Sequence, residues 1–281
     1  MTTQTPEAST PEAVGASPGW SPHRRRQLIR NVQYAVLAGA IALVAVLADW
    51  QRLQQQFLEP SVAREMFPNL ITVALVNTIG YTLSGFGVGL VLGLGIALMR
   101  LSSVGPYRWL AMAYIELFRG LPALLVFIFV GVGVPLAFPG LTFPGGPYGQ
   151  VACALGLVSA AYMAETIRAG IQAVPRGQME AARTLGMSHG TAMRTIILPQ
   201  AFRVIVPPLT NELVLLFKDS SLVLFLGVTL QQRELTKFGR DLASQQANTT
   251  PIFVAGLCYL IITIPLGYLV RRLEARHSKA R

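Results

Sequence analysis

The chain has 281 residues, of which 52% are hydrophobic and only 13% are charged. Soluble domains carry roughly 25% charged residues, so this composition excludes a soluble globule, a disordered chain and a disulfide scaffold. An integral membrane protein is the class that remains. The two cysteines lie in apolar stretches and the three histidines are scattered along the sequence. We therefore expect neither a disulfide framework nor a metal site.

The N-terminal region combines a tail and an apolar stretch. Residues 1–30 are rich in Thr, Pro and Ser and end in a run of arginines, a pattern typical of a disordered basic tail. Residues 31–48 are uncharged over about one membrane crossing. A cleaved signal peptide would share this pattern, but no clear small-residue cleavage site follows. We therefore predict a retained N-terminal transmembrane helix and an external loop over 31–66, with a short surface helix in the Gln-rich part.

A second uncharged stretch runs from Met66 to Met99 and is longer than one straight crossing needs. Within it, Gly85, Gly89 and Gly93 recur every fourth residue, so they share one face of a helix. Inside lipid, close packing rather than water exclusion drives helix association. The pattern therefore predicts a tight contact between this face and another helix.

Further apolar regions follow towards the C-terminus. The uncharged stretch from Gly120 to Ala164 is too long for one crossing, and its Gly- and Pro-rich part, 131–148, should break any helix. Two spans with a loop between them are expected there. The predicted crossings number about six and lie at 31–48, 66–99, 109–130, 149–168, 204–230 and 252–270.

Lysine and arginine are unevenly divided between the two sides of this topology. Sixteen lie on the side that holds both termini and the polar segment 168–203, against five on the other side. An excess of these residues marks the cytoplasmic side. Both termini, including the basic tail 271–281, and the segment 168–203 are therefore expected in the cytoplasm. This topology explains the net charge of +10 without a nucleic-acid partner.

The cytoplasmic segment contains two short helices around a turn. Glu180 lies early in the first helix, where a carboxylate complements the helix dipole. Gly186 can adopt the left-handed conformation that ends a helix, and Ser188 can cap the second helix. Pro199 is expected to limit that second helix. Such a hairpin is either a docking surface or a solvated loop, and physical arguments alone leave both open.

The residues of this hairpin, EAARTLGMSHGTAMRTIILP at 180–199, resemble the EAA loop of permease subunits of bacterial ATP-binding-cassette (ABC) importers. Three flanking stretches resemble the polar amino acid uptake branch of that family. They are AYIELFRGLP at 113–122, AETIRAGIQAVPRGQMEAARTLGMS at 164–188, and PQAFRVIVPPLTNELVLLFKDSSL at 199–222. The resemblance covers roughly 67–270. It implies an all-α integral membrane protein with a five-helix permease core, to which the span at 31–48 adds an N-terminal helix.

The resemblance also implies partners. Glu180, Ala181, Ala182, Gly186 and Ser188 would form a coupling element seated on a cytoplasmic ABC ATPase dimer. A second permease subunit, of the same or a related chain, and an extracytoplasmic solute-binding protein would complete the importer in the lipid membrane.

Nucleotide binding is expected outside this chain. A phosphate-binding loop needs lysine directly after glycine, whereas the three lysines here follow Phe217, Thr236 and Ser278. We therefore expect no cofactor in this chain, with ATP and Mg bound by the ATPase partner, and no enzymatic activity of its own.

Charged and polar residues also lie within the apolar regions, where each is costly unless it is paired or faces a water-filled cavity. They either neutralise one another in a scaffold, as Lys218 could with Asp219 or Glu116, or line a translocation path. For Glu165 and Arg168, near the cytoplasmic end, a scaffold is favoured. The candidate path residues are Glu116, Arg119, Tyr162, Glu165, Asn211, Glu212, Lys218, Asp219, Ser220 and Ser221.

The sequence thus predicts a multi-pass permease subunit of the bacterial inner membrane that carries a polar amino acid. Lys218 and Arg119 favour an acidic substrate such as glutamate, while glutamine, basic amino acids and opine-like compounds stay open. The alternative is a secondary transporter driven by an ion gradient, which usually has internal repeats, and none is found in this sequence. A membrane-embedded enzyme is disfavoured because no Ser/His/Asp or Cys/His arrangement is suitably placed.

Overall fold

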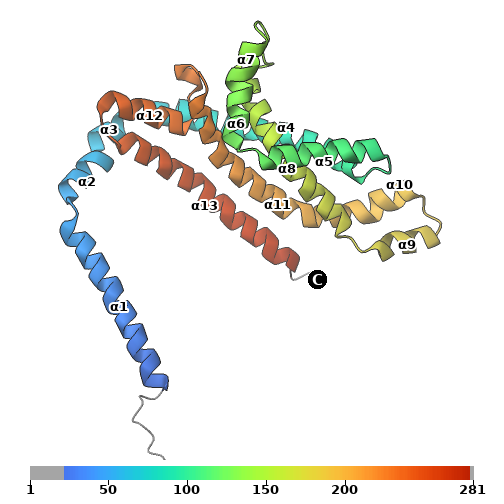
Figure 1. Cartoon of the computed structure of the whole chain (residues 1–281), viewed down its shortest axis with the longest axis horizontal. Coiled ribbons are helices and arrows are strands. Elements are labelled where there is room, and N and C mark those ends of the chain that lie inside the picture. Colours follow the sequence, from blue (N-terminus) through green and yellow to red (C-terminus); the bar gives the residue numbers. More distant parts are fainter. Residues whose placement is uncertain (1–21, 279–281) are drawn as a thin grey trace, which may run out of the picture. The chain divides into compact units, whose positions relative to one another are not determined.

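A computed structural model describes residues 22–278 of the chain. Every regular element in this part is a helix, and no strand occurs within it (Figure 1). Residues 1–21 of the predicted basic tail lie outside the described residues, and so do residues 279–281 of the predicted C-terminal tail. The all-α class implied by the family resemblance is confirmed for these residues.

The chain divides into two compact units after Leu53. The first unit contains α1 (Pro22–Leu47), a long helix with no buried residue in its apolar stretch. Its start lies nine residues before the predicted span, so the arginine run is helical. At its end, the Trp50 indole Nε1 donates a hydrogen bond of 2.7 Å to the carbonyl oxygen of Ala45. A helix that is apolar and exposed on all sides is typical of a lipid-embedded element.

The second unit begins in α2 (Trp50–Phe57) and continues through α3 (Pro60–Glu65). A π-helical turn, η1 (Leu70–Leu75), then runs into α4 (Val76–Leu101). The central partner of α4 is α8 (Pro147–Gln172). Of the other helices, α5 (Gly105–Gly120), α6 (Ala123–Ile128) and α11 (Leu198–Asp219) pack against this pair.

Glycine brings the backbones of α4 and α8 close together. A Cβ atom added at Gly89 would lie 2.1 Å from the Ser159 Oγ, and one at Gly93 would lie 2.9 Å from the Met163 Cβ. One at Gly85 would meet Leu155 at 2.5 Å. Real side-chain carbons never approach this closely, so the interlocking of α4 with α8 requires glycine at these positions.

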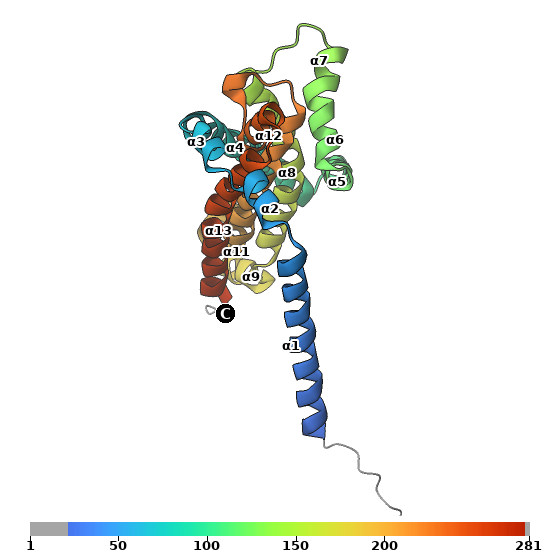
Figure 2. The same cartoon turned by 90° about the vertical axis from the view of Figure 1, so that its left-hand side faces the viewer.

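The region 105–137, which contains the span predicted over 109–130, is sharply bent. α5 (Gly105–Gly120) is followed by α6 (Ala123–Ile128), the π-turn η2 (Phe129–Gly133) and α7 (Val134–Ala137), as Figure 2 shows. The two halves are bent by 103° at Leu121–Pro122. A residue before proline is driven out of the helical conformation, and Leu121 has an extended backbone. The span predicted over 109–130 is therefore broken into two helices at this bend.

The predicted hairpin consists of α9 (Arg176–Thr184), α10 (His189–Ala192) and the π-turn η3 (Met193–Ile197). η3 continues directly into α11 (Leu198–Asp219), so the helical path does not end at Pro199 as the sequence predicted. Pro199 lies in the first turn of α11, directly after the π-turn η3.

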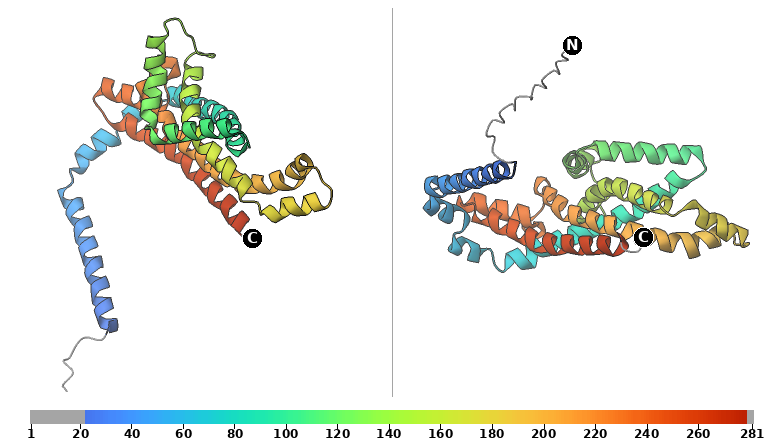
Figure 3. Two further views of the ribbon diagram at one scale, coloured as in Figure 1. Left: turned by 45° about the vertical axis from the view of Figure 1, so that its right-hand side comes forward. Right: turned by 90° about the horizontal axis from the view of Figure 1, so that it is seen from below.

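After α11 the chain passes through the 3₁₀ turns η4 (Ser220–Phe225) and η5 (Leu230–Gln232). It then forms α12 (Leu235–Gln246) and the long α13 (Thr250–Ser278), which packs against α11 and α12. Figures 1 and 3 show α9 and α10 at one end of the second unit and α12 near the other.

Four helical stretches among the described residues are long and apolar enough to cross a membrane: His23–Leu47, Leu70–Leu101, Pro147–Gln172 and Thr250–Ala275. The bent pair, Gly105–Gly120 with Ala123–Ala137, gives a fifth if it counts as one span. α11 is not among them, and it carries Arg203, Glu212, Lys218 and Asp219. The sixth crossing therefore stays a prediction.

Candidate functional site

A pocket of about 250 Å³ lies among α6, α8 and α11. All three charged residues of its lining lie on α11. Glu212 and Asp219 are seven residues apart and therefore share one face of this helix, and Lys218 directly precedes Asp219. α8 contributes the Tyr162 ring and the Ser159 hydroxyl. The pocket thus presents two carboxyl groups and one ammonium group within a small volume.

The remaining walls of the pocket are apolar. Phe127 from α6, Leu155 from α8 and Leu216 from α11 are all buried side chains of the central core cluster. Leu121 and Ala123, on either side of the sharp bend, also line the pocket. Apolar walls lower the local dielectric constant and strengthen the interaction of the charged groups with a polar ligand.

Arg119 does not line the pocket but lies against Tyr162, which does. Its guanidinium carbon lies 5.4 Å from the centre of the Tyr162 ring, within cation–π range. Ion pairs within the described residues join Arg52 to Asp49, Arg168 to Glu165, and both Arg233 and Lys237 to Asp241. Lys218 is therefore paired neither with Asp219 nor with Glu116, the two neutralising partners suggested by the sequence.

Glu165 and Arg168 form a local pair on α8. The Arg168 Nη2 lies 2.7 Å from a carboxylate oxygen of Glu165, and its Nη1 donates to the Gln172 side-chain oxygen at 2.5 Å. Neither Glu165 nor Arg168 lines the pocket. This geometry fits the scaffold role favoured by their sequence position.

The other candidate path residues lie outside the pocket lining. Glu116 and Asn211 are exposed on α5 and α11. Ser220 is buried and donates to the Phe217 carbonyl oxygen at 2.7 Å, while Ser221 is half-buried in η4. The pocket therefore unites Tyr162, Glu212, Lys218 and Asp219. Ser159 was not predicted as a path residue, although its spacing of three from Tyr162 places both on one face of α8.

The α9–α10 hairpin has the turn and the cap predicted from its residues, but Glu180 is the fifth residue of α9 and not part of its first turn, so the predicted contact with the helix dipole is wrong. Gly186 has φ of +82°, a left-handed conformation that favours glycine. The Ser188 Oγ accepts a hydrogen bond of 3.1 Å from the Thr191 N–H and so caps α10. Ala182 is buried, whereas Glu180 and Ala181 are exposed. Leu185, at the tip, is 83% exposed.

At the opposite end of the second unit, side chains of α4 hold the segment 226–234, which contains the 3₁₀ turn η5 and which we call the strap. The Asn77 side-chain nitrogen donates to the carbonyl oxygens of Gln231 at 2.9 Å and Arg233 at 3.0 Å. The Tyr81 hydroxyl donates to the carbonyl oxygen of Gln232 at 2.8 Å. Three successive strap carbonyls are thus bound by two side chains one helical turn apart.

Glu234 closes the strap and caps α12. Its carboxylate is fully buried and accepts hydrogen bonds from the N–H groups of Thr236 at 2.6 Å and Lys237 at 2.5 Å. The Tyr259 hydroxyl donates to it at 2.8 Å. Burial raises the pKa of Glu234 to about 7 despite these bonds. A carboxylate at a helix N-cap is a recognisable sequence pattern, but Glu234 was not predicted from it.

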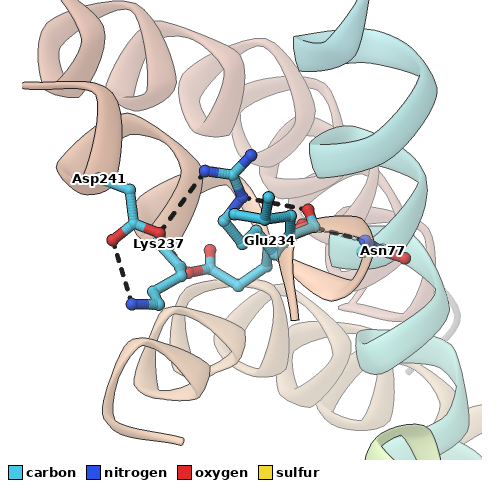
Figure 4. Close-up of polar contacts among 6 residues, drawn as sticks. Asn77, Glu234, Lys237 and Asp241 are labelled. Atoms are coloured by element: carbon cyan, nitrogen blue, oxygen red, sulfur yellow. Dashed lines mark hydrogen bonds and ion pairs between the residues drawn. The ribbon is translucent and has the colours of Figure 1, made fainter. Parts of the chain in front are cut away.

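The charged groups beside Glu234 are paired with one another. Asp241 lies 3.0 Å from the Lys237 ammonium and 3.6 Å from the Arg233 guanidinium, as drawn in Figure 4. Arg233 also lies 5.0 Å from the Phe238 ring centre. These contacts hold Arg233 against side chains of the first two turns of α12.

Comparison with known proteins gives one family match. Residues 85–279 match the family described as "Binding-protein-dependent transport system inner membrane component". The chain is 42% identical over 194 residues to the probable glutamine ABC transporter permease protein GlnM of Bacillus subtilis, covering 68% of this chain and 85% of the relative. It is 37% identical over 207 residues to the glutamate/aspartate import permease protein GltK of Escherichia coli, covering 72% and 91%.

A solved structure, described as an amino acid ABC transporter with histidines, is also similar. It shares 34% sequence identity with the chain and superposes with a TM-score of 0.68, covering 78% of this chain and 99% of that one.

Proposed function

The chain belongs to the family of binding-protein-dependent transport system inner membrane components, and on this premise we propose that the pocket of α6, α8 and α11 carries its substrate. The chain is a permease subunit of an amino acid ABC importer, with ATP hydrolysis in a separate subunit. The observation that carries the proposal is the grouping of Glu212, Lys218 and Asp219 in one partly apolar pocket.

The pocket chemistry matches an amino acid. Every free amino acid carries a carboxylate and an ammonium group, so it needs a cation and an anion at a short separation. Lys218 supplies the cation, and Glu212 and Asp219 supply anions. A hydrogen bond to a charged group contributes about 1.5–3 kcal/mol, and the apolar walls receive the rest of the substrate.

The charge of the pocket also bears on which amino acid is carried. Two carboxyl groups against one ammonium disfavour a substrate with a second carboxylate. We therefore propose a neutral or cationic polar amino acid, of the kind named for the glutamine relative and the structure with histidines, ahead of the glutamate suggested by the sequence. Glutamate, as named for the GltK relative, is the competing outcome.

We further propose the arrangement of the partners. Two ATPase subunits, which bind ATP and Mg, would sit on the α9–α10 hairpins of two permease subunits on the cytoplasmic side. A solute-binding protein would meet the opposite face of the bacterial inner membrane. Both termini would then be cytoplasmic, as the excess of Lys and Arg on that side predicts.

Uptake of labelled amino acids by proteoliposomes containing the whole importer tests the pocket. We expect Lys218→Ala to lower uptake roughly tenfold to a hundredfold by removal of the charged contact. Lys237→Ala, which removes a lysine paired to Asp241 outside the pocket, is the matched control and should keep uptake near wild type. Full uptake by Lys218→Ala would remove this pocket from the path.

Competition with unlabelled glutamine, arginine, histidine and glutamate then assigns the substrate class. Inhibition by glutamate alone would overturn the neutral or cationic assignment. Uptake that continues after ATP depletion under an ion gradient would instead support the secondary transporter.

A further inference from the structure

The strap is attached to the second unit mainly through α4. Asn77 and Tyr81 bind three of its carbonyl oxygens, and the Thr78 hydroxyl accepts a hydrogen bond of 3.1 Å from the Leu235 N–H. Backbone polar groups that leave water need such partners. Side chains can exchange these bonds for bonds to water without unfolding a helix, so an attachment of this kind is reversible.

Asn77 joins three elements at once. It lies on α4, its nitrogen binds two strap carbonyls, and its side-chain oxygen accepts a hydrogen bond from the Tyr148 hydroxyl on α8. Asn77 is almost completely buried. Removal of the amide therefore leaves strap carbonyls without their partner in a site that water enters only if the strap moves.

The strap also carries an apolar plug. Leu226 is buried, and a Cβ added to Gly131 would lie 2.0 Å from its Cδ2 atom, so its side chain rests directly on the backbone of η2. Leu226 belongs to the same core cluster as Phe127 and Leu155, which line the pocket. The plug is thus part of the apolar layer that adjoins the pocket on the strap side.

We propose that the strap closes the transport path at the end opposite the α9–α10 hairpin, with Leu226 as its seal and Asn77 as its latch. This assignment rests on the proposed function, because it concerns the closure of the same path. The glycine-interlocked pair α4–α8 forms the fixed side of the closure. Opening moves Leu226 away from Gly131 and transfers the strap carbonyls from Asn77 and Tyr81 to water.

Thiol accessibility in the intact importer tests this closure. Leu226→Cys is made in a background with Cys153→Ser and Cys258→Ser, because the structure has both native thiols half-buried. The importer, in proteoliposomes, is treated with a membrane-impermeant maleimide on the strap side. Labelling should be slow at rest and faster during turnover with binding protein, substrate and ATP.

The latch variants give the decisive comparison. Asn77→Ala should speed resting labelling of the introduced thiol about tenfold, because removal of a buried hydrogen-bonded group shifts a closed–open equilibrium by about that factor. Tyr81→Phe keeps the buried ring and removes only the bond to Gln232, so it should give a smaller increase if Asn77→Ala fails to fold. Asn248→Ala is the matched control, since it removes an amide-to-carbonyl bond to Gln55 and the acceptor of the Thr250 N–H, both outside the strap.

The proposal is overturned if Asn77→Ala and Tyr81→Phe are labelled at the same rate as the protein with the native Asn77 and Tyr81, and if labelling does not rise during turnover. The strap would then be a static scaffold. A rise in Asn248→Ala equal to that in Asn77→Ala would overturn it too. The pocket is tested separately, because Lys218→Ala should change uptake but leave resting labelling unchanged. Failure of the pocket and failure of the strap therefore give different results.

Discussion

The two ends of the second unit satisfy their polar groups in opposite ways. At the α9–α10 hairpin the bonds are local, such as Ser188 to Thr191 and Arg183 to the Met187 carbonyl. At the strap they cross the sequence, as Asn77 and Gln231 are 154 residues apart. The hairpin leaves Leu185 83% exposed, whereas the strap end buries Asn77 and Glu234.

This difference shows how each end is completed. The hairpin holds its own shape through short-range bonds and leaves an apolar tip exposed. The strap end is completed by the chain itself, so its stability is part of the stability of the whole unit. Substitutions at the strap end should therefore change unfolding, and substitutions at the hairpin should change transport while unfolding stays the same.

The largest expected effect on unfolding is the pH dependence due to Glu234. Its pKa rises from 4.5 to about 7 on folding, so the protonated form is the one that folding favours. The stabilisation is complete below about pH 4.5 and is lost as the pH rises through about 7, an effect of about 3 kcal/mol. Denaturant unfolding in detergent should show this decline, and Glu234→Gln should remove it. An identical decline in the variant would assign it to other groups.

Thr78→Val at the strap end should have the next largest effect. It leaves the buried Leu235 N–H without its acceptor and should lower the free energy of unfolding by about 1–3 kcal/mol. Thr72→Val is the control, because the Thr72 hydroxyl is exposed and bonds only within its own turn. Equal losses in the two variants would contradict a special role for the strap contact.

At the hairpin, Gly186→Val should cost about 1–2 kcal/mol locally, because a side chain disfavours the left-handed conformation. We expect uptake to fall roughly tenfold while ATP hydrolysis continues and the global unfolding energy stays unchanged. Gly190→Val lies in α10 without a positive φ and serves as the control. Normal uptake by Gly186→Val in membrane vesicles would count against its role in coupling.

The smallest effect is expected for Ser188→Ala, which removes the cap of α10 at a local cost of about 1 kcal/mol. Uptake should fall by roughly half, with unfolding in detergent unaltered. Ser188→Asp restores a capping oxygen and should restore uptake. A fall that Asp does not rescue would point to a direct contact of the serine with a partner.

Features with local causes could be predicted from the sequence. The glycine spacing on α4, the left-handed Gly186 and the Ser188 cap each depend on residues within a few positions. The bend at Leu121–Pro122 could also have been predicted from the proline. It was missed because the apolar run is continuous there, and hydropathy does not indicate a change in the direction of a helix. The continuation of helix through Pro199 was missed because proline usually ends a helix.

Features with distant causes could not be predicted. The pocket unites four of the ten candidate path residues, since only the packing of α8 against α11 decides which faces meet. Asn77 and its strap carbonyls lie more than 150 residues apart, and no local pattern marks them as partners. Glu116 and Asn211 show the reverse case, because polar residues in an apolar region can simply face outward.

The interlock between α4 and α8 has a practical consequence for spectroscopy. With Gly89 seated on Ser159 and Gly93 on Met163, sliding of one helix along the other would drive backbone into side chain. A pair of spin labels, one on each of these helices, should keep a constant separation throughout the transport cycle. Such a pair provides an internal ruler against which displacements of α12 or the α9–α10 hairpin can be read.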